Sequence, residues 1–321
     1  MRNIFLALFI LQIIAIQTFS QTFEECSDSL KLHTEPLLKL KTEMETGLFV
    51  PTDFAIDTMQ VDPLKTEINY LNLAGISAIA LGAGTVVHFY QANAWWKDQR
   101  TAFHFQNDWS YALWLDKIGH FYGAHILSHF FAVGFEASNF ETEDAALYSS
   151  IAAFAFQMYV EIEDGFGKDW GFSPGDATGD FLGAAYSYSQ YKFPVLKNFN
   201  LKASYYPSEE YRNGQHEDGN TFDDYEGQKF WITFKMKELL PKSIAEYWPA
   251  ILQLAAGYGV KNLDGSGGGR KEFYIAFDLD LEEIPLHGKF WQFWKSSLNY
   301  FHLPMPGIRI SPGVAIFGLC Y

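Results

Sequence analysis

Apolar and polar positions along this 321-residue chain repeat with two different periods, and the change falls near residue 199. Before that point the apolar residues form long runs, whereas after it they alternate with polar residues, which is the period of a strand. The first half contains four such runs, at residues 71–89, 115–135, 145–163 and 174–191. Together these runs predict a four-helix unit.

The run at residues 71–89 stands apart because it contains no aspartate, glutamate, lysine or arginine. It is long enough to span a bilayer, and small residues such as Gly75 and Gly82 would let a neighbouring helix approach closely. A buried helix of a soluble bundle is the alternative interpretation. Tryptophans at positions 95, 96, 109 and 114 follow, either as rings at a membrane boundary or as a soluble aromatic cluster.

Residues 271–281 give the clearest strand pattern, because Phe273, Ile275 and Phe277 alternate with more polar positions such as Asp278. We therefore expect a strand whose apolar face is buried against protein or lipid. Weaker alternation occurs at residues 201–206, 229–236, 251–260 and 308–319.

These segments predict about five strands in the second half of the chain. A closed membrane barrel needs about eight, so five are too few to form one. The glycine-rich residues 265–269 predict the tip of a hairpin. The predicted fold class is α+β, an apolar four-helix unit followed by an antiparallel strand-rich domain that is a β-meander or partial barrel.

The first residues have the pattern of a secretory signal peptide. A charged start and the apolar residues 4–16 precede a small-residue cleavage site that ends at Ser20, so we expect the mature chain to begin near Gln21. An uncleaved anchor is the alternative, although the apolar run is shorter than the roughly 20 residues of a spanning helix. The predicted divisions are a signal peptide (1–20), an N-terminal surface segment (21–66), a helical domain (67–195) and an antiparallel β-rich domain (196–321).

The amino-acid composition limits which kinds of binding partner the protein can have. Aspartate and glutamate outnumber lysine and arginine by 38 to 23, and the net charge of -15 argues against nucleic acid, whose phosphates need a basic surface. The only two cysteines, Cys26 and Cys320, rule out a disulfide-rich scaffold and leave one bridge between them open. The residues before Cys26 are not the small and apolar ones expected before a lipidated cysteine, so no lipid anchor is predicted there.

Ionisable side chains interrupt the apolar helices at helical spacing. Polar groups inside such helices are costly to bury, so they are usually paired with one another or serve a site. The candidate site residues are Asp116, Lys117, His120, Glu161, Asp164, Ser173, Asp176 and Asp180.

Spacing groups these candidates by face. Asp116 and His120 lie four residues apart and therefore share one face of a helix, and the same spacing recurs between Asp176 and Asp180. His125 projects from roughly the opposite side of the helix that carries His120, so one helix cannot present all of its histidines to a single metal ion.

Capping explains part of this pattern without any function. Ser173 is a good N-cap, Pro174 suits the first helical position, and Asp176 favours the positive end of the helix. Capping does not explain Asp180, which lies a turn deeper.

Three interpretations of the polar residues remain open. They form a satisfied network that fixes helix packing, or His120, Glu161 and Asp180 hold a divalent metal whose bound water could serve hydrolysis. In the third, His120 is a general base that Asp116 orients. None of these has the specificity of a zinc motif such as His-Glu-x-x-His.

These residues carry a resemblance to a known family. The segments D116-K-I-G-H-F121, 161–164, W170-G-F-S-P-G-D176 and Gly183 resemble the YfiM-like family, described as predicted periplasmic lipoproteins of unknown function. More distantly, the Asp-Lys-x-x-His helix and the Asp176 to Gly183 pattern look like those of VanZ-like membrane proteins. The resemblance spans about residues 95–191 and implies a compact helical unit in the cell envelope. It implies no reaction.

The sequence therefore predicts an uncharacterised cell-envelope protein, membrane-associated and structural or ligand-binding, with a polar site between helices. The alternative is a metal-dependent or acid–base hydrolase that acts on an envelope lipid or glycan. The expected location is the envelope of a bacterium, in the periplasm or at a membrane, the outer membrane included. The expected partners are the membrane and an envelope protein or lipid.

Overall fold

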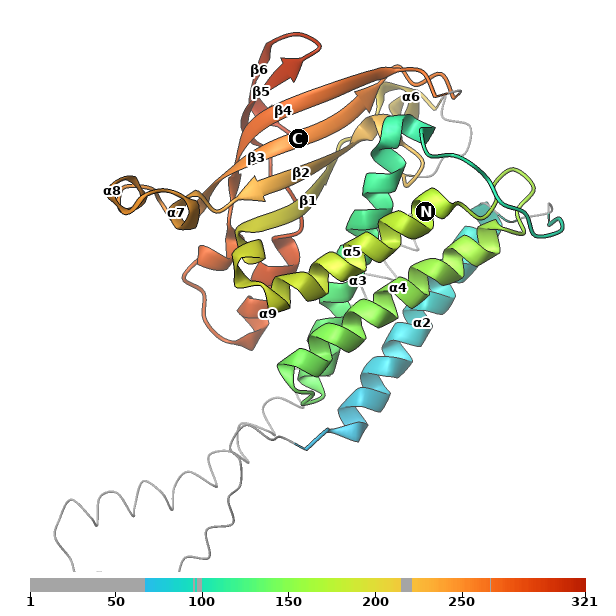
Figure 1. The fold of residues 1–321 in the computed structure, drawn as a ribbon, viewed down its shortest axis with the longest axis horizontal. Coiled ribbons are helices and arrows are strands. Elements are labelled where there is room, and N and C mark those ends of the chain that lie inside the picture. The colour runs from blue at the N-terminus through green and yellow to red at the C-terminus, as the bar shows by residue number, and fades with distance from the viewer. Residues whose placement is uncertain (1–66, 95, 97–99, 215–220, 266) are drawn as a thin grey trace, which may run out of the picture. The chain divides into compact units, whose positions relative to one another are not determined.

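The computed structural model describes residues 67–94, 96, 100–214, 221–265 and 267–321. Residues Thr66–Tyr321 form one compact unit, in which helices come first and a six-stranded antiparallel sheet follows (Figure 1). This order confirms the predicted α+β fold class. The expected signal peptide, the 21–66 segment, Cys26 and Trp95 lie outside the described residues.

All four predicted helices are present, with bounds that differ from the expected ones by a few residues. They are α2 (Tyr70–Ala94), α3 (Leu115–Ala137), α4 (Thr142–Asp164) and α5 (Pro174–Lys192). The last three helices pack against one another. Helix α2 contacts them at both of its ends: the Asn72 side chain donates to the Ala137 carbonyl, and the His88 ring contacts the Tyr159 ring. By length and composition, α2 and α4 are the two described helices that could cross a membrane.

Glycines on α5 allow it to lie directly against the backbone of α3. A Cβ atom at Gly183 would be 2.0 Å from the carbonyl oxygen of Phe121, and one at Gly179 would be 2.7 Å from that of Lys117. Because a larger residue would push the helices apart, this contact depends on glycine. It also brings the side of α5 that carries Asp180 against α3.

The sheet is a meander in which every strand pairs with its neighbour in the sequence. Its strands, in order, are β1 (Phe199–Tyr205), β2 (Gln228–Phe234), β3 (Leu252–Lys261), β4 (Arg270–Leu279), β5 (Met305–Ser311) and β6 (Ala315–Cys320). The prediction of one strand across residues 308–319 is wrong, because Pro312 and Gly313 interrupt it between β5 and β6. Proline has no N–H to donate to a strand ladder.

Short helices fill the connections. They are α6 (Glu209–Arg212), α7 (Met236–Leu239), α8 (Lys242–Ala245) and α9 (Lys289–Leu298), together with the 3₁₀ turns η1 (Tyr111–Trp114), η2 (Pro194–Asn198), η3 (Tyr225–Gly227) and η4 (Leu281–Glu283). The sequence pattern did not predict α9. The segment that follows α9 lies alongside β1, because Phe301 forms a parallel β-bridge with Ala203.

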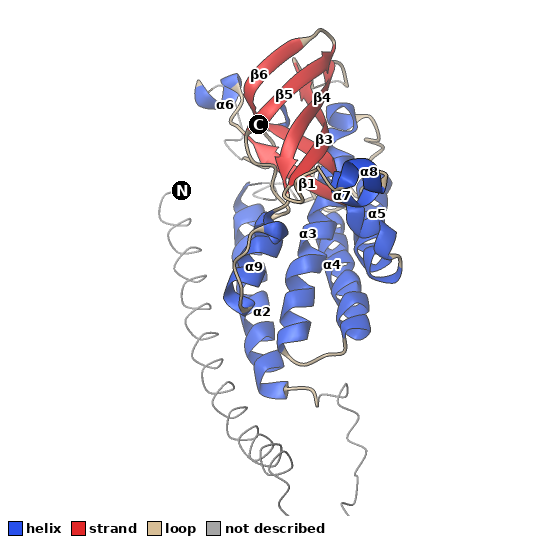
Figure 2. Cartoon of the chain, turned by 90° about the vertical axis from the view of Figure 1, so that its left-hand side faces the viewer, coloured by secondary structure: helices blue, strands red, loops and turns tan. Residues whose placement is uncertain are grey.

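The sheet is strongly curled, as Figure 2 shows. The rings of Tyr206 and Tyr321, which follow the two outermost strands, stack with their centroids 5.1 Å apart. On the inner side, Trp231 of β2 packs over Gly257 of β3 and reaches Tyr274 of β4. The two edges of the sheet therefore approach each other at one end.

The apolar side of β4 is not buried within the chain, so of the two expected surroundings, protein or lipid, the chain itself does not supply the first. Phe273, Ile275 and Phe277 are 42%, 49% and 39% exposed, whereas Tyr274 and Asp278 on the opposite side are buried. The alternation is confirmed, but the buried side is the polar one.

One part of the sheet rests on the first turns of α3. Phe230 and Val260 pack with Leu115, and the partly buried Tyr122 and Tyr258 extend this cluster. The contact links the strand half to the helix that carries His120.

The close approach of α3 and α5 is directly testable. Gly183→Ala should destabilise the protein by about 1–3 kcal/mol, because the new methyl group would overlap the Phe121 carbonyl. The matched control is Gly75→Ala in α2, where nothing lies within 4 Å, and which should be neutral or slightly stabilising. Chemical denaturation of both variants measures the difference, and equal stabilities would contradict the packing.

Candidate functional site

His120 lies at the centre of the buried polar cluster. Its Nδ1 atom is 3.1 Å from Asp180 Oδ1 and 3.7 Å from Glu161 Oε1. On the other side of the ring, Nε2 is 3.7 Å from Asp176 Oδ1 and 3.9 Å from Asp116 Oδ1. Carboxylates from three helices therefore surround one imidazole.

The Nε2 side of His120 contains a lysine among its carboxylates. Lys117 Nζ lies 2.8 Å from Asp108, 2.7 Å from Asp116 and 2.7 Å from Asp176. Its side chain is only 7% exposed, so these are buried ion pairs. One cationic group thus serves three carboxylates on this side.

The Nδ1 side of His120 has no such counter-charge. Glu161 and Asp180 are 2% and 0% exposed, and neither forms an ion pair with a lysine or arginine among the described residues. Neutral donors reach them instead, from the Ser173 amide to Glu161 at 3.2 Å and from the Gln157 amide group to Asp180 at 2.9 Å. The second oxygen of Asp180, Oδ2, is buried without a hydrogen-bond partner in the described chain.

The helix that carries Asp180 starts as its sequence predicts. Ser173 is the N-cap of α5 and its hydroxyl accepts from the Asp176 amide at 3.1 Å. The same hydroxyl donates to Asp108, so the cap is also tied to the partners of Lys117. The Asp176 carboxylate itself is used for the ion pair with Lys117.

The electrostatics follow from burial and from these charges. Burial lowers the pKa of His120, but the hydrogen bond and charge of Asp180, with the charges of Asp176 and Asp116, raise it well above its usual 6.5. Burial and the charge of Asp116 raise the pKa of Asp176, whereas His120 and Lys117 lower it. The net result is a pKa of about 7. Although burial alone would raise the pKa of Asp116, the charges of His120 and Lys117 hold it below its usual range.

Asp164 is a predicted candidate that forms no ion pair with His120 or Lys117 in the described structure. It accepts a hydrogen bond of 2.6 Å from the indole N–H of Trp96. Trp96 is only 5% exposed, so it belongs to the protein interior and not to a membrane boundary. Trp109 and Trp114, by contrast, contact each other with tilted rings at the surface.

Three residues of the cluster were not among the predicted candidates. Asp108 lies in the loop before α3, Gln157 lies one turn before Glu161, and the Tyr225 hydroxyl donates to Asp116 at 2.8 Å. Only Gln157 had a local signal, since it shares the helical stripe of Glu161. Tyr225 comes from the strand half, 109 residues away in the sequence.

The other histidines of α3 lie outside the cluster, as predicted. His125 is 2% exposed and its Nδ1 lies 2.6 Å from the Ser187 hydroxyl, while His129 Nε2 lies 3.0 Å from the Ser297 hydroxyl. Burial, with a contribution from His129, lowers the pKa of His125 to about 3. His125 is therefore a neutral, buried histidine.

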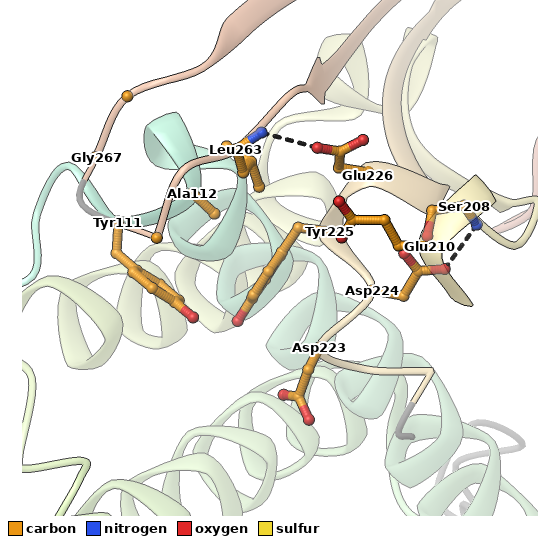
Figure 3. Close-up of a pocket in the computed structure, with 12 residues that line it drawn as sticks. Tyr111, Ala112, Ser208, Glu210, Asp223, Asp224, Tyr225, Glu226, Leu263 and Gly267 are labelled. Atoms are coloured by element: carbon orange, nitrogen blue, oxygen red, sulfur yellow. Dashed lines mark hydrogen bonds between the residues drawn. The ribbon is translucent and has the colours of Figure 1, made fainter. Parts of the chain in front are cut away.

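A pocket of about 150 Å³ adjoins the cluster on the far side of Tyr225. Figure 3 shows the rings of Tyr111 and Tyr225 converging at their hydroxyl ends beside Asp223. The acidic residues around this pocket are Glu210, Asp223, Asp224 and Glu226. Because the Tyr225 hydroxyl bonds to Asp116, one side chain forms the wall between pocket and cluster.

Comparison with known proteins finds a family model that matches part of the helical half. Residues 104–192 match the model of a family described as predicted periplasmic lipoprotein (DUF2279). The match supports the YfiM-like resemblance, and the protein is an exported protein of the cell envelope. No curated protein and no solved structure matches the chain.

Coupling within the cluster can be measured by a double-mutant cycle. His120→Ala and Asp180→Ala should each destabilise the protein by about 1–3 kcal/mol or more, because each leaves a buried partner unsatisfied. The double variant should cost clearly less than the sum, since the two groups share one interaction. His125→Ala combined with Asp180→Ala is the control and should be additive in denaturant unfolding. Additivity in both pairs would show that His120 and Asp180 do not interact.

His125 predicts an acid-sensitive step in stability. Its folded pKa of about 3 lies below the usual 6.5, so between these values the unfolded chain binds a proton that the folded chain excludes. The stability from this group is therefore complete above pH 6.5 and is lost as the pH falls towards 3. The drop in thermal midpoint from pH 6.5 to pH 4.5 should be smaller in His125→Gln than in the wild type, and an equal drop would contradict the assignment.

Proposed function

We propose that this protein is a membrane-associated binding protein of the bacterial envelope that holds a divalent metal ion at His120, Glu161 and Asp180. The observation that carries the proposal is that two buried carboxyl groups face the Nδ1 side of His120 and that, among the described residues, no lysine or arginine pairs with them. Burial, with the charges of Asp176 and Asp180, raises the pKa of Glu161 to about 9, so without a metal ion this carboxyl group keeps a proton because the site lacks positive charge to stabilise its anion. Burying an uncompensated carboxylate costs several kcal/mol, and a divalent cation would remove that cost.

The donor set suits a metal ion. One ligand atom from each of His120, Glu161 and Asp180 lies within 4.8 Å of the other two. A single imidazole with carboxylate oxygens is a set that borderline and hard divalent ions accept, such as Zn²⁺ and Mn²⁺. The unpartnered Asp180 Oδ2 supplies a further free acceptor.

The surroundings support this assignment in two further ways. Gln157 donates a hydrogen bond to Asp180, and the Ser173 amide donates one to Glu161. Metal-binding carboxylates commonly have such hydrogen-bond donors in their outer shell. The acidic pocket beyond Tyr225 would concentrate cations near the cluster.

Metal binding to the purified full-length protein tests the proposal. We expect the wild type to bind about one Zn²⁺ or Mn²⁺ per chain in equilibrium dialysis followed by elemental analysis. Asp180→Asn and Glu161→Gln should weaken that binding at least tenfold, in the range typical for loss of a ligand or its support.

Asp164→Asn is the matched control, because this half-buried carboxylate is also on α4 but bonds to Trp96 outside the ligand set. It should bind the ion as the wild type does, and circular dichroism should show that every variant is folded. Absence of binding in the wild type, or equal binding in all folded variants, would refute a metal site at these residues.

A hydrolase is the second candidate, and the exposure of His120 favours it. The His120 side chain is 22% exposed, whereas the carboxylates around it are 10% exposed or less. An imidazole that reaches solvent while Asp180 orients it has the arrangement needed for acid–base catalysis, and its raised pKa makes it a proton donor in the resting protein. Ester hydrolysis by the wild type that persists in the presence of a metal chelator and that His120→Gln abolishes would support this candidate.

A further inference from the structure

The outward side of the curled sheet carries a continuous row of apolar side chains. In the strand register, Ile232 pairs with Ala256, Ala256 with Ile275, Ile275 with Ile308, and Ile308 with Ile316. The four isoleucines of this row are 38%, 49%, 40% and 80% exposed. The row therefore crosses five strands without a polar residue.

Neighbouring positions widen this row into a surface. Phe273 and Phe277 lie two residues either side of Ile275 on the same face of β4, and Ile310 does the same beside Ile308 on β5. All three are 39% exposed or more. We call Ile232, Phe273, Ile275, Phe277, Ile308, Ile310 and Ile316 the apolar sheet face.

The opposite side of the same sheet buries charged and polar groups. Lys202, Gln253 and Asp278 are all 0% exposed, and Lys202 Nζ lies 3.3 Å from Asp278. Glu272, 2% exposed, forms 2.8 Å ion pairs with Arg270 and with Arg309. A sheet in water normally buries its apolar side, so this sheet has the reverse polarity.

We propose that the apolar sheet face contacts the acyl chains of a lipid membrane. Polar inside and apolar outside is the alternation of strands that face lipid. Exposed apolar patches beyond a few hundred Å² on soluble proteins otherwise mark interaction sites. Lipid is the apolar partner that an exported envelope protein meets.

The distribution of charge around the face fits a bilayer. Along β4 the outward positions from Phe273 to Leu279 are uncharged, whereas exposed charges stand at either end, at Arg270 and Lys271 before them and at Glu282 and Glu283 after them. The strands β3 and β4 have 10 residues each, and a strand of about 9–11 residues crosses the hydrocarbon core.

The curl favours lipid over a second copy of the chain. The polar residues occupy the inner side, where Trp231 reaches across to Tyr274, so the apolar face is the convex one. Two convex surfaces touch over a small area, whereas fluid acyl chains follow any contour. Exposed apolar residues on the helices, such as Ile151 (56%) and Phe181 (55%), are consistent with the same surroundings.

Site-directed fluorescence on the full chain in vesicles tests the proposal. With Cys26→Ser as background, Ile275→Cys and Ile308→Cys are each labelled with bimane, and the remaining Cys320 is only 3% exposed. Lys271→Cys and Glu282→Cys, beyond the two ends of the uncharged run on β4, are the controls. Each labelled protein is reconstituted into phosphatidylethanolamine and phosphatidylglycerol vesicles with or without acyl-chain nitroxide lipids.

We expect nitroxide lipids to quench probes 275 and 308 at least threefold more than probes 271 and 282, and aqueous iodide to show the opposite order. Iodide quenching at 275 and 308 equal to that of the controls would overturn the proposal. Protection from both quenchers would also overturn it, because protein would then cover the face. Two independent positions guard against one variant that fails to fold, and neither touches the metal ligands, so failure here leaves the metal-site test intact.

Discussion

The cost of burying carboxylates around His120 is the constraint on which the helical half depends. Asp116, Glu161, Asp176 and Asp180 come from three helices and are nearly removed from water. Each would be strongly unfavourable alone, so the helices must hold them where Lys117, His120 and neutral donors can reach them. The glycines of α5 make this geometry available, because they let its backbone meet α3 closely enough for short ion pairs to form.

The same balance recurs in the sheet with different residues. Lys202, Asp278 and Glu272 are enclosed by the curl while isoleucines and phenylalanines face outward. The two halves meet where Phe230 packs on Leu115, and Tyr225, next to that contact, bonds to Asp116. In both halves, therefore, charged groups are buried together in the interior while some apolar side chains face outward.

Much of the architecture could be predicted from local pattern. Helical periodicity located α3, α4 and α5 to within a few residues, and the Ser173-Pro174 pair marked the start of α5 correctly. These features succeed because hydrogen bonds within a helix and its cap depend on near neighbours. The missed division between β5 and β6 shows the limit, since an apolar pattern on both sides of Pro312 outweighed its turn signal.

By itself, the sequence determined which helices carry ionisable groups, which of those groups share a face, and that the strand residues alternate in polarity. Only the tertiary structure decided that His120 has one side with a lysine and one side without, because Lys117 could have paired with any nearby carboxylate. It alone brought Asp108 and Tyr225 into the cluster, and it alone turned the apolar side of β4 outward. Period two shows that a strand has two unlike faces, but which face is buried depends on what the folded chain places against each one.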